Sequence, residues 1–278
     1  QTQLALRQSF QAIQPVSRLE PLPLSFAQTR LWFLEQLQTG SAIYNIPTAY
    51  RVQGSLNLAL LKQSFNEIVR RHETLRTNFT LVEGQPVQVI SKTFSLDEQE
   101  QEIQRLATKE AQKNFDLAHD PLIRVTLLKL NETEHVVLLT LHHIIADGWS
   151  MEILIKELAI LYEAFSKKQP SPLPELTIQY ADFAVWQRQW LQGERLETQL
   201  AYWKKQLGGM LNVLQLPTDY PRARVQSFRG EHQTFSLSET LTQKLKALSQ
   251  RESTTLFTTL LAAFKVLLYR YTGQDDII

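Results

Sequence analysis

The segment 141–150, with the sequence LHHIIADGWS, places three titratable side chains within six positions. It continues an apolar run that begins at Val136, and this run predicts a strand that is buried on both faces. A helix is predicted from about Ser150 to Phe165, so the segment joins a buried strand to a helix through a loop. Such a connection is typical of folds that mix α and β structure.

The two adjacent histidines are expected to have different surroundings. Neighbouring strand residues point to opposite faces, so His142 and His143 should not face one cavity. One imidazole is then chemical and suited to proton transfer near neutral pH, with Asp147 orienting it or holding the loop, and Gly148 lets backbone approach a substrate. Alternatively, both histidines pack in the core and Asp147 only caps the next helix. The spacing leaves both interpretations open.

Elements predicted on either side of this segment alternate between helices, strands and hairpins. A hairpin is expected over residues 75–90 with its turn at Glu83 and Gly84, and the turn NETE should join strands 122–130 and 136–143. The remaining predicted helices and strands are a helix after Ser25, a strand at 44–52, a helix capped by Asn57, a polar helix at 97–114, helices at 180–191 and 196–207, a strand at 231–237, and helices at 239–250 and 256–271. This order favours a mixed α and β fold of the α+β kind.

Proline-rich and irregular stretches divide the chain into four parts. We assign 1–22 to an entry linker, 23–175 to an N-terminal lobe, 176–229 to a helical and irregular connection, and 230–278 to the start of a C-terminal lobe. The chain has no initiating methionine and stops at GQDDII, inside an expected strand. The second lobe is therefore expected to be incomplete, and these residues alone are expected to be inactive.

Composition excludes several classes of function. Lys and Arg total 29 against 28 Asp and Glu, so no overall charge attracts nucleic acid or an anionic membrane. Hydrophobic residues make up 43% and no stretch resembles a membrane span or a signal peptide, which indicates a globular protein and no membrane partner. The absence of cysteine excludes a disulfide scaffold or a thiol nucleophile and is compatible with the cytoplasm.

Other chemistries lack their usual sequence signals. A metal site built on His142, His143 and Asp147 is disfavoured, because the two imidazoles should point apart and no HExxH string is present. No GxSxG or SxxK string supplies an activated nucleophile, so an acyl group would have to arrive already activated. GxGxxG and P-loop strings are also absent, which removes the sequence signals for bound nucleotides.

HHIIADGWS at 142–150 resembles the HHxxxDG signature of the condensation domains of nonribosomal peptide synthetases, which are relatives of chloramphenicol acetyltransferase. Further blocks resemble that family in the same order, so the resemblance covers essentially the whole chain. They are LSFAQTRLWFLEQL at 24–37, RHETLRTNF at 71–79, YADFAVWQ at 180–187 and LPTDYPRARVQSFRG at 216–230. The chain looks most like the subtype that joins an L-aminoacyl or L-peptidyl donor to an L-aminoacyl acceptor.

The resemblance implies a chloramphenicol acetyltransferase-like sandwich of two similar lobes with a tunnel between them. It implies that upstream and downstream peptidyl carrier proteins insert their 4′-phosphopantetheine arms from opposite sides, with an adenylation domain adjacent in the same polypeptide. The implied reaction forms an amide bond between the carrier-bound thioester donor and the α-amine of the carrier-bound acceptor. The domain itself is expected to bind no cofactor and no metal.

Roles for individual residues also follow from the resemblance. His143, the second histidine of the signature, is the implied catalytic imidazole, His142 is its structural partner, and Asp147 is mostly architectural. The backbone N–H of Gly148 is a candidate donor to the tetrahedral oxyanion.

Three more residues are expected to support this loop. Trp149 and Ser150 are expected to shape the acceptor channel, or else to serve only as loop and helix-start residues. Arg76, within RHETLRTNF, is expected to pair with Asp147, because a buried carboxylate is costly without a cation.

Rival functions stay open at this point. One is an acyltransferase of the same fold that acts on a free amine or hydroxyl, which differs in needing no carrier-bound acceptor. Another is a noncatalytic carrier-docking module, disfavoured because His142, His143 and Asp147 are all present. Epimerisation of a tethered residue is a third alternative on a related fold.

Overall fold

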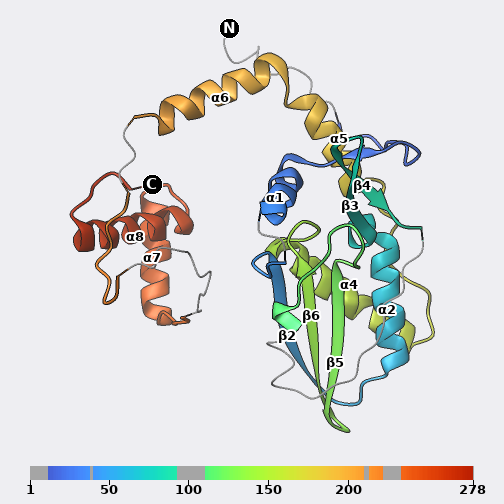
Figure 1. Cartoon of the computed structure of the whole chain (residues 1–278). Helices are drawn as coiled ribbons and strands as arrows, with labels where there is room; N and C mark the ends of the chain where they lie inside the picture. Colours follow the sequence, from blue (N-terminus) through green and yellow to red (C-terminus); the bar gives the residue numbers. More distant parts are fainter. Residues whose placement is uncertain (1–11, 38–39, 93–109, 210–212, 222–232, 278) are drawn as a thin grey trace. The chain divides into compact units, whose positions relative to one another are not determined.

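The computed structural model describes residues 12–37, 40–92, 110–209, 213–221 and 233–277. These residues form two compact units, Gln1–Gly193 and Glu194–Ile278, and each is described on its own (Figure 1). Within the described ranges, no helix is long and apolar enough to cross a membrane. Both helices and sheets are present, as the sequence predicts.

A three-stranded antiparallel sheet carries the segment that contains the histidines. It consists of β2 (Asn45–Gln53), β6 (Glu134–His142) and β5 (Ile123–Asn131), in that order across the sheet. The central position of β6 explains its composition, because every residue from Val137 to His142 is buried. The predicted doubly buried strand is confirmed, and it lies between two partner strands.

A second, smaller sheet has the order β1 (Leu22–Pro23), β4 (Gln85–Ile90) and β3 (Thr77–Val82). The predicted hairpin between β3 and β4 is confirmed, with its turn at Glu83 and Gly84. Both turn residues have positive φ, 51° and 74° respectively, as the favoured two-residue hairpin turn requires.

The helices of the first unit begin where the sequence supplies capping side chains. They are α1 (Phe26–Leu37), α2 (Leu58–Arg71), the short 3-10 helix η1 (Glu73–Arg76), α4 (Gly148–Ser166) and α5 (Tyr180–Trp190). The predicted cap of α2 is confirmed, because Asn57 Oδ1 accepts a hydrogen bond of 3.2 Å from the N–H of Leu60. Helix α4 begins two residues before the predicted start, since Asp147 caps it.

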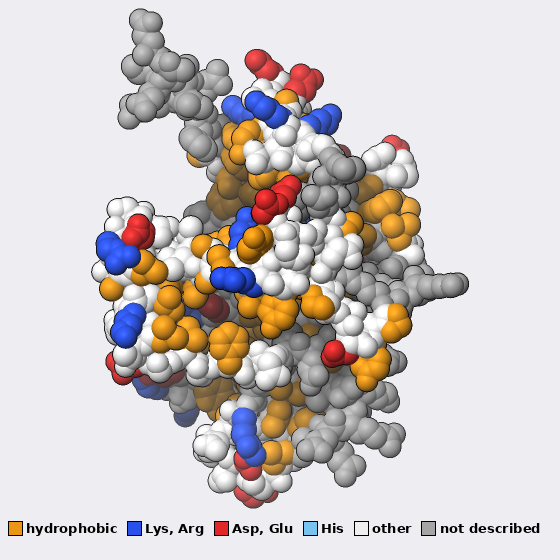
Figure 2. Space-filling view, turned by 90° about the vertical axis from the view of Figure 1, so that its left-hand side faces the viewer, with side chains coloured by type: hydrophobic (Ala, Val, Ile, Leu, Met, Phe, Trp, Pro, Cys, Tyr) orange, Lys and Arg blue, Asp and Glu red, His pale blue; other side chains and the backbone are white. Residues whose placement is uncertain are grey.

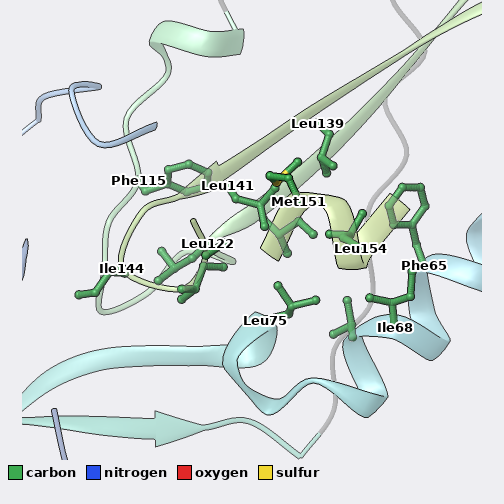
Figure 3. Close-up of a cluster of buried hydrophobic side chains, with 14 of the residues drawn as sticks. Phe65, Ile68, Leu75, Phe115, Leu122, Leu139, Leu141, Ile144, Met151 and Leu154 are labelled. Atoms are coloured by element: carbon green, nitrogen blue, oxygen red, sulfur yellow. The ribbon is translucent and has the colours of Figure 1, made fainter. Parts of the chain in front are cut away.

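The hydrophobic core joins the sheet of β2, β6 and β5 to helices α2 and α4 (Figure 3). Phe65 and Ile68 come from α2, Leu139 comes from β6, and Met151 and Leu154 come from α4. This core holds both the strand before the 143–147 loop and the helix after it. The loop therefore runs between two fixed ends.

The second unit is helical where it is described, with α6 (Gly193–Leu207) leading into it and α7 (Glu239–Arg251) and α8 (Leu256–Thr272) within it. The predicted strand at 231–237 is wrong for its described part, since residues 233–237 have no regular structure. A strand needs a hydrogen-bonded neighbour, and the described residues of this unit include no strand to supply one.

Large hydrophobic side chains remain exposed on α8, among them Phe257 and Phe264. Figure 2 shows many hydrophobic side chains at the surface on the face that it draws.

Some expectations fall outside the described residues. The predicted helix at 97–114 lies there apart from residues 110–114, of which 110–112 are helical. Most of the block at 216–230 and the larger part of the entry linker lie there as well. The assignment of lobes and linkers stays a prediction.

Candidate active site

The backbone after β6 makes a tight turn that is anchored on both sides. The N–H of Ile145 donates to the carbonyl of His142 at 3.1 Å and closes the turn. The N–H of His142 donates to the carbonyl of Leu122 at 3.0 Å, and that of His143 donates to the carbonyl of Tyr44 at 2.8 Å. The position of both histidines is therefore fixed by neighbouring segments.

His142 is a core residue, only 1% exposed. Its Nδ1 accepts a hydrogen bond of 3.1 Å from the N–H of Ile144, and the rings of Tyr44 and Phe115 meet its ring edge-on at 6.3 and 6.0 Å. Burial lowers the pKa of His142 to about 4, and repulsion from His143 acts in the same direction. The ring is neutral at physiological pH.

His143 is exposed, in contrast to its neighbour. The expected separation of the two imidazoles is observed, but its cause differs from the expectation. Strand β6 ends at His142, so the turn directs His143 outward, where alternation along a longer strand would have done so by another route. Of the two histidines, His143 is therefore the one that a substrate can reach.

Asp147 caps helix α4. Its Oδ1 accepts hydrogen bonds from the N–H of Ser150 at 2.9 Å and from the Ser150 hydroxyl at 2.7 Å, and the N–H of Asp147 donates back to Ser150 Oγ at 3.2 Å. The hydroxyl of Ser150, and then its N–H, hold the pKa of Asp147 below its usual value. The capping role that the spacing left open is the one the structure shows.

The expected ion pair between Arg76 and Asp147 is wrong. The Arg76 guanidinium donates to the carbonyl of Ser91 and lies 3.8 Å from Glu73, and within the described residues it makes no ion pair with Asp147. The expectation assumed a buried carboxylate. Asp147 is exposed and already satisfied by the start of α4, so it needs no cation.

Thr74, which the sequence did not single out, links the 71–79 block to the loop. Its hydroxyl donates to the carbonyl of Ile145 at 3.2 Å. The contact uses a backbone acceptor 71 positions away, so no local pattern reveals it. The same is true of the contact between Tyr44 and His143.

We expect Asp147→Ala to destabilise the protein by about 1 kcal/mol, the usual value of a helix N-cap. Arg76→Met should add to this loss without coupling, within about 0.5 kcal/mol, because the two side chains do not interact. Urea unfolding of both single variants and the double variant measures this. A coupling energy of several kcal/mol would restore the ion pair that the structure lacks.

The residues that begin α4 border open space. An added Cβ on Gly148 would meet nothing within 4 Å, and Trp149 is 77% exposed. Ser150 lines a cavity of about 110 Å³, together with His72 and Thr74 and several apolar side chains. The described residues contain no group of three or more His, Cys, Asp or Glu side chains placed to hold a metal ion.

The arrangement suits proton transfer or positioning of a nucleophile at an exposed imidazole. A neutral, buried His142 holds the backbone, and His143 presents its ring beside the start of α4. The backbone N–H groups in the first turn of a helix lack intrahelical acceptors and can donate to a developing negative charge.

Known proteins share this sequence and fold. Residues 19–278 match the family model of the condensation domain. The linear gramicidin synthase of Brevibacillus parabrevis includes a polypeptide that is 51% identical over 276 residues, which cover 95% of this chain and 4% of that protein. This chain therefore spans only a small part of the curated relatives that it matches.

Solved structures agree with this match. The X-domain from teicoplanin biosynthesis aligns with a TM-score of 0.81 at 28% identity, over 94% of this chain and 59% of that one, and a structure of its complex with OxyB aligns with a TM-score of 0.80. The first condensation domain of the CDA synthetase has the same fold, with a TM-score of 0.73 at 20% identity, over 93% of this chain and 64% of that one. With its mixed α and β, chloramphenicol acetyltransferase-like fold, its HHxxxDG loop and its match over most of its length, the chain belongs to the condensation-domain family of nonribosomal peptide synthetases.

Proposed function

We propose that this domain forms an amide bond between a thioester-bound aminoacyl or peptidyl donor and the α-amine of an aminoacyl acceptor. The observation that carries the proposal is the exposed imidazole of His143, held directly after a buried, neutral His142 in the signature loop. Membership of the condensation-domain family supports the choice of reaction.

The acceptor amine attacks the donor carbonyl carbon, a C–N bond forms, the C–S bond breaks, and the carrier thiol leaves. His143 takes the amine proton or holds the amine in line for attack. A free amine is already a good nucleophile, so orientation and electrostatics contribute as well as basicity. The N–H of Gly148 is the proposed donor to the oxyanion, and Trp149 and Ser150 border the acceptor side.

Both substrates arrive on the 4′-phosphopantetheine arms of carrier proteins, one upstream and one downstream, and an adenylation domain acts in the same polypeptide. The domain itself uses no cofactor or metal in this proposal. The donor and acceptor are of the L configuration, as the sequence blocks around Ser25 and His143 suggest. The lack of cysteine is compatible with a reducing compartment such as the cytoplasm.

The test is a condensation assay on the full-length protein with both carriers loaded. We expect mass spectrometry to find the new peptide on the acceptor carrier, and to find none when either carrier is unloaded. A matched reaction replaces the loaded acceptor carrier by the same amino acid as a free amide. Equal rates with the free amine would favour the acyltransferase alternative and contradict a carrier-bound acceptor.

A docking module is the second candidate, because the teicoplanin X-domain was solved in complex with OxyB. The presence of His142, His143 and Asp147 in this chain favours catalysis over docking alone. Absence of peptide from every substrate pair, combined with stable binding of a partner protein, would favour the docking candidate.

A further inference from the structure

Two buried polar atoms lie opposite each other behind the 143–147 loop. They are Oε2 of Glu35, on α1, and Nε2 of His142, at the end of β6, and they are 3.9 Å apart. Both atoms are buried and, in the described part of the chain, neither has a hydrogen-bond partner. Buried polar atoms in native proteins are nearly always satisfied, so this pair calls for an explanation.

The hydrogen bonds of His142 determine what its Nε2 can do. Nδ1 accepts from the N–H of Ile144, so the single proton of the neutral ring is on Nε2. Nε2 is thus a donor, and Glu35 Oε2 is an acceptor facing it. A hydrogen bond of 2.7–3.2 Å would need an approach of about 1 Å, which a small side-chain rotation of Glu35 provides.

Glu35 is held in place from its other side. Its side chain is buried, and the backbone N–H of Gly40 donates to its carboxyl group. Gly40 has a φ of +79°, and an added Cβ would come within 3.2 Å of Asn114 Nδ2. Glycine at this position therefore lets the backbone reach the Glu35 carboxyl group.

The surroundings of the pair argue against an ion pair. Burial lowers the pKa of His142 to about 4 and raises that of Glu35, which the hydrogen bond from Gly40 only partly opposes. An N–H donor facing a carboxyl oxygen is satisfied without any charge on the imidazole. A neutral ring also keeps Nδ1 free to accept from Ile144.

We propose that Glu35 is a positioning residue, which accepts a hydrogen bond from His142 Nε2–H and so fixes the ring that holds the loop. His142 Nδ1 holds the backbone of Ile144, and Tyr44 holds that of His143. A shift of the His142 ring would therefore move the backbone on both sides of His143. The consequence for catalysis rests on the proposed function, whereas the hydrogen bond does not.

The experiment compares Glu35→Gln, which keeps an acceptor, with Glu35→Met, which keeps the length but removes it. The six histidines of the 278-residue chain are labelled with ¹⁵N, and the His142 signals are assigned by their loss in His142→Gln. Leu31→Ala, a buried substitution on the same helix, controls for loss of stability alone.

We expect the Nε2–H proton of His142 to resonate downfield in the original chain, in Glu35→Gln and in folded Leu31→Ala. In Glu35→Met it should shift upfield and exchange faster with solvent. Condensation by the full-length protein should fall about tenfold in Glu35→Met and recover in Glu35→Gln, the size expected of one hydrogen bond.

An unchanged Nε2–H signal in Glu35→Met would overturn the pairing, and so would loss of the signal in both Glu35 variants. If the proton responds as expected but condensation does not fall, Glu35 holds His142 without positioning the catalytic group, and the positioning role is refuted. If the full-length protein forms no peptide at all, the amide-forming function fails, while the proton signal still decides the pairing.

Discussion

Replacing His143 by alanine is expected to slow peptide formation by about a hundred- to ten-thousandfold, the range of general acid–base contributions. The exposed position of His143 means that removing its ring opens no cavity, so the protein should remain folded. Product formation is measured by mass spectrometry with both carriers loaded, and a melting curve of the same preparation reports on folding.

His142→Ala is the matched comparison, because the two residues are neighbours with opposite burial. Removal of a ring that is 1% exposed and packed against Tyr44 and Phe115 should destabilise the protein by about 1–3 kcal/mol. Full activity in a well-folded His143→Ala protein would exclude a catalytic role for this imidazole.

The second large effect is expected at a buried ion pair between α2 and α4. Arg71 is 4% exposed and Glu157 is 9% exposed, and their side chains meet at 3.2 Å. Arg71 also donates to the carbonyl of Pro174, and His72 Nε2 lies 2.8 Å from the Glu157 carboxylate. Replacing Arg71 or Glu157 by alanine should cost about 3–5 kcal/mol, because the remaining charge stays buried without its partner.

The double variant Arg71→Met, Glu157→Leu should lose less stability than the two single losses combined, since it leaves neither charge behind. Urea unfolding of the four proteins measures this. The neighbouring Arg70 provides the control, because it pairs with Glu67 on the surface, and Arg70→Ala should cost less than about 1 kcal/mol. Equal losses at Arg70 and Arg71 would show that burial of the pair contributes nothing.

The same pair predicts a dependence on pH. Burial opposes ionisation of Glu157, but the hydrogen bonds from Arg71 and His72 outweigh it and lower the pKa of Glu157 in the folded protein. A carboxyl group with a lowered folded pKa adds stability above its unfolded pKa and loses it as pH falls through the folded pKa. The stability difference between the original chain and Glu157→Gln should therefore shrink in acid.

Features with local causes could be predicted from the sequence. The apolar run in β6, the asparagine cap of α2 and the hairpin turn at Glu83 and Gly84 each depend on neighbouring residues, and each is observed. The strand predicted at 231–237 depended on a partner strand, which a local pattern cannot supply. Its described residues form no strand.

The candidate site was predictable only in part, for the same reason. The contrast between His142 and His143 follows from their adjacency at a strand end, and the structure shows it. The error at Arg76 came from taking Asp147 as buried, and exposure is a property of the folded loop. The pair of Glu35 and His142 joins positions 107 residues apart, a separation at which sequence alone gives no signal of contact.

The hairpin turn at 131–134 lies at the opposite end of β6 from His142, roughly 25–30 Å away along a nine-residue strand. Glu132 and Thr133 are exposed, and the turn is held by a local hydrogen bond of 2.9 Å from the N–H of Thr133 to Asn131 Oδ1. A fluorophore or affinity tag attached at Thr133 would therefore stand clear of the reacting groups. Sequence drift at this turn is tolerated for the same reason, whereas deletion of one residue within β6 would exchange the two faces of the strand and expel His142 from the core.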